Sequence, residues 1–163
     1  MSDIPEHATL SPAKPGFRGV TLLSLDAKGR LAVPVRYRDA LFGDEQKLVV
    51  TAGQGSFLMI YPRWIWQPKQ DELMALPSFD DAVSDLQRRL VGYAEDVEPD
   101  SVGRILISPS LRDIAQLGRQ VALVGLGTRF EVWDKSLWDE RMEAAKTKFK
   151  KNTLPPSLEG FSL

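Results

Sequence analysis

The chain has 163 residues, a size that fits one ordinary domain or two very small ones that share a core. Hydrophobic residues make up 43% of it and charged residues 26%, which is the balance of a folded, soluble protein and excludes a disordered or membrane-embedded chain. Cysteine is absent and the single histidine, His7, lies in a proline-rich start, which excludes disulfides, Cys-ligated metals and a Ser-His-Asp triad. We therefore predict no catalytic residue, metal or cofactor.

The net charge of −1 does not by itself indicate a nucleic-acid partner. A local excess of positive charge nevertheless occurs between residues 14 and 38, where six basic side chains accompany one acid, Asp26. The six are Lys14, Arg18, Lys28, Arg30, Arg36 and Arg38. This segment is the part of the chain that fits a polyanion. Neither a signal peptide nor a membrane-spanning run is recognised, so a cytoplasmic protein is expected.

The first predicted strand follows a leader, residues 1–16, that we expect to be disordered. It covers Phe17 to Leu25, which is rich in β-forming residues. A turn is predicted at Asp26 to Gly29, because Asp accepts hydrogen bonds from nearby backbone and Gly tolerates a positive φ. Extended chain resumes at Arg30 to Val33.

A helix and a hairpin are predicted next. Pro34 suits the first position of a helix and Gly43 suits its end. The apolar runs at 47–51 and 56–61 flank a glycine-containing loop, which is typical of a β-hairpin.

The middle of the chain predicts two helices. The first covers residues 64–76, and Pro68 is expected to start or kink it. The second is capped by Asp80 or Ser78 and stops at Gly92. Its apolar stripe consists of Val83, Leu86 and Leu90.

The same order of signals then returns. Ser108 is predicted to cap a short helix that Pro109 opens and Gly118 ends. A second hairpin is predicted between residues 120–125 and 130–133.

The last predicted helix opens with a capping box at Ser136 to Asp139. Its apolar stripe consists of Trp138, Met142, Ala145 and Phe149. We predict that this stripe packs on the protein's own core, and a subunit interface is the alternative.

Two segments of the chain are copies of each other, 74 residues apart. The copied motif is Asp-x-x-Gly-Arg, present as Asp26, Gly29 and Arg30 and again as Asp100, Gly103 and Arg104. At the same spacing Leu48–Gly53 falls on Ala122–Gly127, and one deletion then sets Phe57 opposite Phe130. A copy of about 45 residues is too small to hold a core alone. The predicted α+β fold therefore interleaves both copies in one barrel-like core with a pseudo-twofold axis.

These motifs resemble the MraZ family. The first copy matches at Phe17-Arg18-Gly19, Leu25 to Leu31, Val33-Pro34 and Tyr37-Arg38-Asp39. The second half matches at Gln87-Arg88, Leu90-Val91-Gly92, Gly103 to Ile107, Leu123-Val124-Gly125 and Phe130 to Trp133. The doubled motif with its spacing is far more specific than either copy alone. The sixteen residues before Phe17 are longer than the usual start of this family.

The resemblance implies two tandem SpoVT-AbrB-like swapped-hairpin units, at residues 17–66 and 93–137. A helical connector at 67–92 would join them, and 138–163 would form a C-terminal helix and tail. It further implies a transcriptional regulator of the nucleoid that assembles into a ring-like homo-oligomer. Such proteins bind direct repeats in double-stranded DNA upstream of their own gene, at the head of the division and cell-wall gene cluster, and can repress that promoter.

The basic side chains of the first copy are the expected DNA contacts. Arg30 comes first, because it is the arginine of the family motif and a guanidinium can bind phosphate or guanine in a bidentate manner. The other four are Lys28, Arg18, Arg36 and Arg38. The alternative is that Arg30 only pairs with Asp26, and Arg104 with Asp100, across each turn. Residues 94–112 carry two bases and four acids, so the second copy is expected mainly to complete the core.

Two other functions compete with this interpretation. An antitoxin or protein-binding scaffold is the main rival, because single swapped-hairpin units also occur in toxin-neutralising proteins. An enzyme comes third, since Gly53-Gln54-Gly55 and Gly125-Leu126-Gly127 lack the residues that would complete a nucleotide-binding loop.

Overall fold

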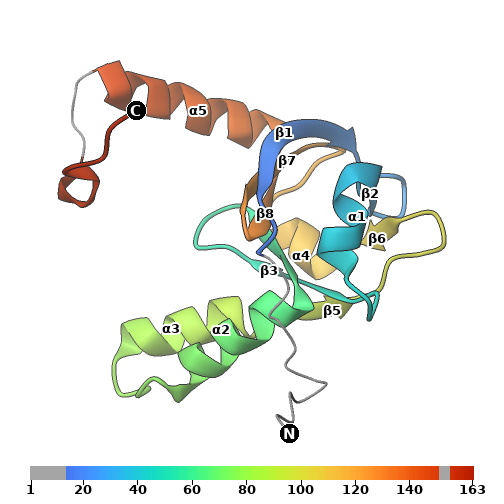
Figure 1. The fold of residues 1–163 in the computed structure, drawn as a ribbon, viewed down its shortest axis with the longest axis horizontal. Helices are drawn as coiled ribbons and strands as arrows, with labels where there is room; N and C mark the ends of the chain where they lie inside the picture. The colour runs from blue at the N-terminus through green and yellow to red at the C-terminus, as the bar shows by residue number, and fades with distance from the viewer. Residues whose placement is uncertain (1–13, 151–154) are drawn as a thin grey trace, which may run out of the picture.

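The computed structural model describes residues 14–150 and 155–163, which form a mixed α+β fold (Figure 1). Its strands are β1 (Phe17–Ser24), β2 (Arg30–Ala32), β3 (Leu48–Ala52), β4 (Leu58–Pro62), β5 (Glu95–Val97), β6 (Arg104–Leu106), β7 (Gln120–Gly127) and β8 (Arg129–Asp134). Its helices are α1 (Val35–Phe42), α2 (Arg63–Ala75), α3 (Asp81–Leu90), α4 (Pro109–Ile114), α5 (Lys135–Lys150) and the 3-10 turn η1 (Pro156–Leu158). Most of the predicted leader, including His7, lies outside the described residues.

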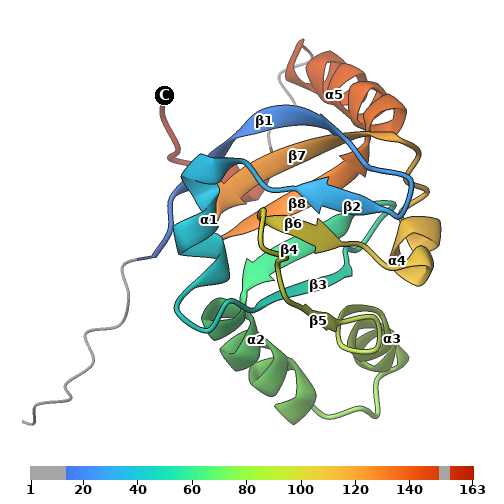
Figure 2. The same cartoon turned by 90° about the vertical axis from the view of Figure 1, so that its right-hand side faces the viewer.

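Two antiparallel sheets organise the described strands. The larger sheet has the order β1-β7-β8-β4-β3-β5, and β2 pairs with β6 in a separate ribbon. Each hairpin therefore takes its outer neighbour from the other repeat, because β1 pairs with β7 and β5 pairs with β3. Figure 2 shows the ribbon in front of the larger sheet, with α1 on one side and α4 on the other. Strands β1 and β5 remain edges, so hydrogen bonds do not close the expected barrel-like core.

The pseudo-twofold axis passes through the ribbon at the pair Leu31 and Ile105. The flanking pairs are Arg30 with Leu106 and Ala32 with Arg104. A half-turn about this point therefore places each strand on the other, with Arg30 on Arg104. Both central side chains are fully buried. They join the main core between ribbon and sheet, whose other members include Val33, Leu41, Leu123 and Phe130.

The pairing registers correct the alignment of the two hairpins. Val50 pairs with Ile60 in the first hairpin, and Leu123 pairs with Val132 in the second. Across the centre of the sheet, Ile60 pairs with Phe130. Val50 thus corresponds to Leu123, 73 residues later, so the prediction that placed Leu48–Gly53 on Ala122–Gly127 is wrong by one residue. The match of Phe57 with Phe130 is also wrong by one, because a second residue is missing from the shorter second hairpin loop.

Several helix boundaries confirm the sequence predictions. The Asp80 carboxylate accepts a hydrogen bond from Ala82 N at 2.9 Å and caps α3. Ser108 Oγ accepts from Leu111 N at 3.3 Å, and Pro109 opens α4. These side chains satisfy backbone N–H groups that the first helical turn leaves without partners.

Other boundaries differ from the predictions. Pro34 precedes α1 instead of opening it, and α4 ends at Ile114, before Gly118. Pro68 lies inside α2, which begins at Arg63. The cap of α5 is Asp134, whose carboxylate accepts from Ser136 N at 3.1 Å, so the predicted capping box is wrong. The same carboxylate also accepts from Leu137 N at 3.4 Å, so a residue at the end of β8 caps the first turn of the helix.

The longer helices lie on the outer face of the larger sheet, which is the face away from the β2–β6 ribbon. Helices α2 and α3 lie together at one end of the molecule and α5 lies at the other (Figures 1 and 2). Within α5, Met142 is 42% exposed and Phe149 is 67% exposed. The prediction that the whole stripe packs on the protein's own core is therefore wrong for these two side chains. None of the helices in the described part of the chain is long and apolar enough to span a membrane.

Candidate nucleic-acid interface

The turn that begins at Asp26 is closed by its own carboxylate. Asp26 Oδ1 accepts hydrogen bonds from Lys28 N at 3.0 Å and Arg30 N at 2.9 Å. Asp26 Oδ2 accepts from Arg30 Nε at 2.6 Å, which makes a charge-assisted pair across the turn. The aspartate thus fixes both the backbone of the turn and the direction of the Arg30 side chain.

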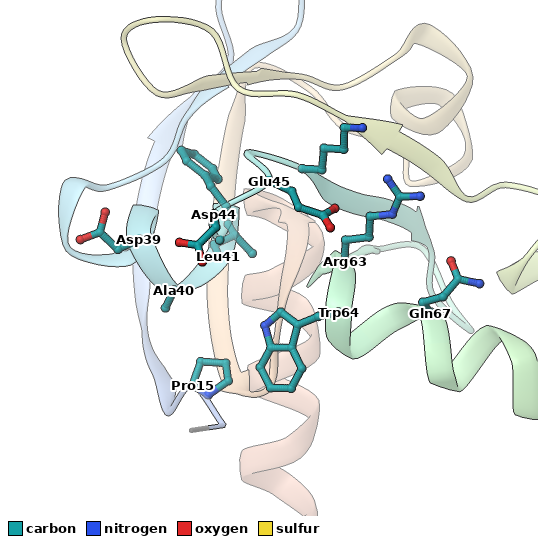
Figure 3. A pocket seen from close by; sticks show the side chains of 12 residues that line it. Pro15, Asp39, Ala40, Leu41, Asp44, Glu45, Arg63, Trp64 and Gln67 are labelled. Atoms are coloured by element: carbon teal, nitrogen blue, oxygen red, sulfur yellow. The ribbon is translucent and has the colours of Figure 1, made fainter. Parts of the chain in front are cut away.

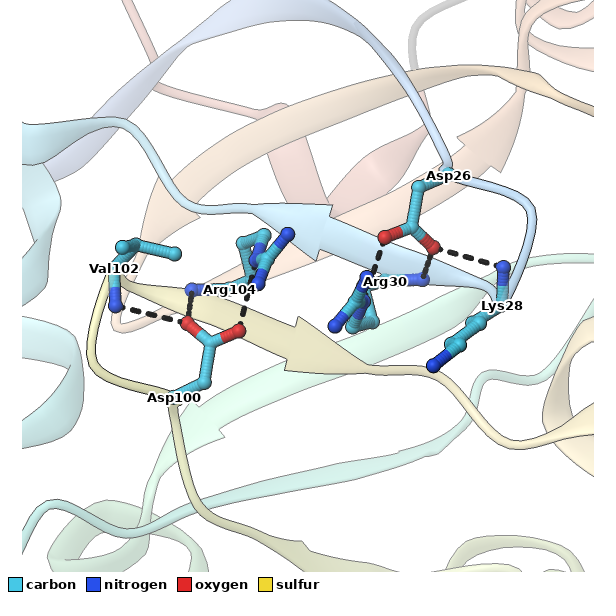
Figure 4. Close-up of polar contacts among 6 residues, drawn as sticks. All are labelled: Asp26, Lys28, Arg30, Asp100, Val102 and Arg104. Carbon is cyan, nitrogen blue, oxygen red and sulfur yellow. Dashed lines mark hydrogen bonds and ion pairs between the residues drawn. The ribbon is translucent and has the colours of Figure 1, made fainter.

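The second copy of the motif repeats this geometry. Asp100 Oδ1 accepts from Val102 N at 3.0 Å and Arg104 N at 2.9 Å, and Asp100 Oδ2 accepts from Arg104 Nε at 2.8 Å (Figure 4). The pairing of each arginine with its own aspartate, which the sequence suggested as an alternative to DNA contact, is therefore present in both copies, and it leaves the DNA contact a prediction. Because only Nε makes this bond, the two terminal nitrogens of each guanidinium remain available to bind another group.

The same hydrogen bonds lower the pKa of both aspartates. The backbone N–H of Arg30 is the largest cause that lowers the pKa of Asp26, to about 2, and the Arg30 side chain adds to it. The pKa of Asp100 is likewise lowered, first by the backbone N–H of Arg104. Both carboxylates are therefore ionised at neutral pH, as the two arginine pairs require.

Each turn is covered by an arginine of the other repeat. Gly29 and Gly103 both have positive φ, at +89° and +80°. A Cβ atom added to Gly29 would lie 2.6 Å from Arg112 Nε, and one added to Gly103 would overlap the Arg38 guanidinium. Each turn therefore requires its glycine for two reasons: the positive φ and the close approach of the arginine.

The ribbon brings Arg30 and Arg104 onto one face. Leu31 and Ile105 point into the core, and side chains alternate along a strand, so Arg30 and Arg104 point outward. Figure 4 shows the two arginines between the two turns, which lie at opposite ends of the ribbon. Their side chains are 31% and 37% exposed. The structure therefore joins residues that the sequence analysis had assigned to different roles.

The other predicted contacts fall in two places. Lys28 is exposed at the first turn, and its counterpart at the second turn is Val102. Arg36, on α1, donates to Thr21 Oγ1 at 3.1 Å. Arg18 is exposed on β1, and its carbonyl oxygen accepts from the Tyr37 hydroxyl at 2.7 Å.

Arg38 has a different position. It is half-buried, and its Nε donates to the Val33 carbonyl at 2.9 Å while the guanidinium lies over Gly103. It therefore supports the turn of the second repeat, as well as adding positive charge beside the ribbon.

Two second-repeat arginines at the first turn were not predicted. A hollow of about 700 Å³ beside Asp26 and Ala27 is lined by Arg112 and Arg119. Arg112 follows Arg38 at the 74-residue spacing of the repeat, but only the swapped strands place it beside the first turn. No sequence signal indicated Arg119.

A second hollow lies between α1 and α2 and has a volume of about 550 Å³ (Figure 3). Pro15 and Trp64 lie at its edge, and three acids line it, namely Asp39, Asp44 and Glu45. Lys47 and Arg63 also line it, so this hollow has no excess of positive charge that would favour a nucleic acid.

The arrangement of the ribbon suits a nucleic acid better. A two-stranded β-ribbon fits the major groove of B-DNA, which is roughly 12 Å wide, and guanidinium groups bind guanine edges or phosphates there. The ribbon offers Arg30 and Arg104 on its outer face, with Lys28 at one end.

Comparison with known proteins identifies the family of the chain. The family model described as "MraZ protein, putative antitoxin-like" matches the chain twice, at residues 17–89 and 90–153. A transcriptional regulator MraZ from Nitrosomonas europaea is 49% identical over 90% of this chain and 99% of its own length. Those from Methylobacillus flagellatus and Thiobacillus denitrificans are 50% and 45% identical over the same shares of each chain. The chain therefore belongs to the MraZ family, whose similar members are named transcriptional regulators.

Proposed function

We propose that the chain binds direct repeats upstream of its own gene, at the head of the division and cell-wall gene cluster, and represses that promoter. It acts in the nucleoid as a ring-like homo-oligomer. The observation that carries the DNA-binding part is the β2–β6 ribbon, which presents Arg30 and Arg104 on one outer face. Their ion pairs with Asp26 and Asp100 hold both side chains in place before DNA binds, so less side-chain entropy is lost on binding.

In this proposal some residues contact DNA bases and others contact phosphates. Arg30 and Arg104 bind base edges in the major groove. Lys28, Arg18, Arg36 and Arg38 bind phosphates and set the position of the protein on the duplex. Arg30 contributes more than Arg104, because Lys28 stands beside the first turn where the second turn has Val102.

Several copies of the ribbon would act together on repeated DNA. In a ring, binding of one ribbon to one repeat raises the effective concentration of the next ribbon at the next repeat. Binding should therefore be micromolar or weaker on a single repeat, tighten strongly on several, and weaken steeply with salt.

Fluorescence anisotropy on DNA from upstream of the gene tests this function. Arg30→Ala should weaken binding to four repeats by about 10- to 100-fold, since a bidentate base contact is worth about 1–3 kcal/mol. Arg104→Ala should weaken it by a smaller factor. The matched control is Arg88→Ala on α3, which removes an exposed ion pair with Asp85 away from the ribbon and should leave affinity unchanged. Wild-type affinity of Arg30→Ala, or equal affinity for one and four repeats, would contradict the proposal.

The alternative is an antitoxin-like or scaffold protein, a role favoured by the description of the matching family model. A toxin-neutralising chain should co-purify with a small protein at fixed stoichiometry, whereas a promoter-binding ring should purify as one chain. Mass spectrometry of the purified native complex distinguishes the two.

A further inference from the structure

The two ends of the β2–β6 ribbon share the residues of the motif. Each end carries an arginine that pairs with the aspartate of its own turn, and a covering arginine that comes from the other repeat. The pseudo-twofold axis relates these groups, so they give both ends the same chemistry. A difference between the ends must come from residues that the axis does not repeat.

Two basic residues at the first end have neutral counterparts at the second. The 74-residue spacing sets Val102 against Lys28. The hairpin registers, which relate residues 73 positions apart, set Gln46 against Arg119. Neutral residues thus replace two positive charges, so the first end of the ribbon is the more basic one.

Other unequal charges beside the ribbon do not offset this difference. Lys47 and Glu98 are charged where the first end has neutral residues, and their charges cancel. Arg36 of α1 has no basic counterpart on α4. Its guanidinium lies over the Tyr37 ring and donates to Thr21 Oγ1 on β1, so it is directed at the sheet and not at a turn.

Arg119 lies at the hollow of about 700 Å³ beside the first turn. Its side chain is exposed, and within residues 14–150 and 155–163 it has no ion pair or side-chain hydrogen bond. Arg112 lines the same hollow, and its Nε donates to the Ile107 carbonyl at 3.1 Å, which leaves its terminal nitrogens for another group. Two guanidinium groups therefore line one hollow with N–H donors still available.

One acid, Asp26, lines the hollow as well. Its carboxylate accepts hydrogen bonds from Lys28 N and from both N and Nε of Arg30, so the charge of Arg30 balances it. The hollow thus keeps the positive charges of Arg112 and Arg119. A guanidinium binds phosphate oxygens through two parallel N–H···O bonds, and this geometry suits a phosphodiester group of a DNA backbone.

The hollow lies where the backbone of a bound duplex would pass. Ala27, in the turn itself, lines it, and Figure 2 shows this turn and α4 side by side at one end of the ribbon. The ends of a ribbon that lies in the major groove come close to the phosphates that border the groove. A phosphate contact at this end is therefore compatible with base contacts from the middle of the ribbon.

We propose that Arg119 and Arg112 hold one phosphate of the DNA backbone in this hollow, beside the Asp26 turn. The contact rests on the proposed DNA-binding function and adds a phosphate site that the second repeat makes at one end of the ribbon only. Because the other end has Gln46 in place of Arg119, the contact favours one of the two directions that the pseudo-symmetric ribbon could take on a duplex. It thereby sets the direction of the protein on each direct repeat.

The salt dependence of binding to a duplex with one repeat tests the phosphate contact. Each such contact contributes about 0.9 to the slope of log K against log salt concentration. Arg119→Ala should lower this slope by about 0.9, which corresponds to binding about 8-fold weaker at ~0.1 M salt and nearly unchanged near ~1 M. Arg88→Ala removes the same charge from α3 and should leave slope and affinity unchanged.

Uncharged methylphosphonates, placed at one phosphate of the duplex at a time, locate the contact. One replacement should weaken binding of the wild type and leave that of Arg119→Ala as it was, because the variant no longer contacts that phosphate. An iron-EDTA probe attached at Ala27→Cys should cut the DNA beside this position. The same probe at Ser101→Cys, in the second turn, should cut on the other side of the repeat, and the chain contains no cysteine of its own.

The outcomes separate this contact from the function on which it rests. If the wild type does not bind the DNA, or if Arg30→Ala binds it with full affinity, both the proposed function and the contact are overturned. If Arg30→Ala is weakened but Arg119→Ala keeps the wild-type slope, or if no methylphosphonate distinguishes Arg119→Ala from the wild type, only the contact is overturned. Cleavage by both probes on both sides of the repeat would overturn the direction that the contact sets.

Discussion

Arg38 of the first repeat lies directly over Gly103 of the second, and its Nε donates to the Val33 carbonyl at 2.9 Å. Arg112 lies over Gly29 in the same way and donates to the Ile107 carbonyl at 3.1 Å. Each copy of the Asp-x-x-Gly-Arg turn is therefore completed by a side chain of the other copy. The two repeats depend on each other at the surface that we propose for DNA binding, as well as in the core.

Removal of either covering arginine should reduce stability. Arg38→Ala deletes a hydrogen bond from a charged donor to a half-buried carbonyl, and we expect a loss of about 1–2 kcal/mol in the free energy of unfolding. Arg112→Ala should cost a similar amount because its contacts are equivalent. Urea denaturation measures both, with the exposed Arg88→Ala as a control that should change stability by less than ~0.5 kcal/mol. A loss no larger than that of the control would show that the arginines do not support the turns.

Substitution of the turn glycines should be costly for a different reason. Gly29→Ala forces a residue with a Cβ atom into a φ of +89° and displaces the Arg112 guanidinium, so we expect a loss of roughly 1–3 kcal/mol. Gly16→Ala is the matched control, because nothing lies within 4 Å of a Cβ atom there. Thermal unfolding of the two variants measures the difference. Similar melting temperatures for both would contradict the assignment.

The low pKa of Asp26 predicts a defined response to acid. Its pKa is about 2 in the folded protein and about 3.9 in an unfolded chain, so its contribution to stability is complete above pH ~4 and is lost as the pH falls towards 2. Asp26→Asn should be less stable than the wild type at neutral pH, and this difference should shrink between pH 4 and pH 2. Urea denaturation at pH 7, 4 and 2.5 provides the measurement. A difference that stays constant over this range would mean that the ionised carboxylate does not stabilise the turn.

The sequence predicted the features that local chemistry determines. The Asp26 and Asp100 turns follow from the ability of aspartate to accept hydrogen bonds from backbone two and four residues later, and these bonds lie within the motif itself. The caps at Asp80 and Ser108 are equally local. Such features need no knowledge of how the two repeats pack.

Features that depend on pairing between distant strands could not be predicted. Arg112 and Arg119 reach the first turn only because the hairpins are swapped. The correct match of Val50 with Leu123 required the register of both hairpins, since one missing residue leaves an apolar run that matches equally well at either position. Pro68 is accommodated inside α2 although a proline in the first turns of a helix would ordinarily mark its start.

The pair Leu31 and Ile105 should make the two repeats unfold together. Both side chains are fully buried and lie opposite each other on the pseudo-twofold axis, so each belongs to the core of both repeats. Leu31→Ala and Ile105→Ala should each cost about 2–5 kcal/mol, whereas Leu106→Ala, at a position that is 50% exposed, should cost far less. Tryptophan fluorescence and far-ultraviolet circular dichroism should still report one transition with the same midpoint for each variant, because the main core takes its side chains from both repeats. Two transitions in Leu31→Ala, with only one displaced from the wild-type midpoint, would show that the repeats fold independently. The two losses should also be non-additive in the double variant, since side chains in contact share the cavity that their truncation creates.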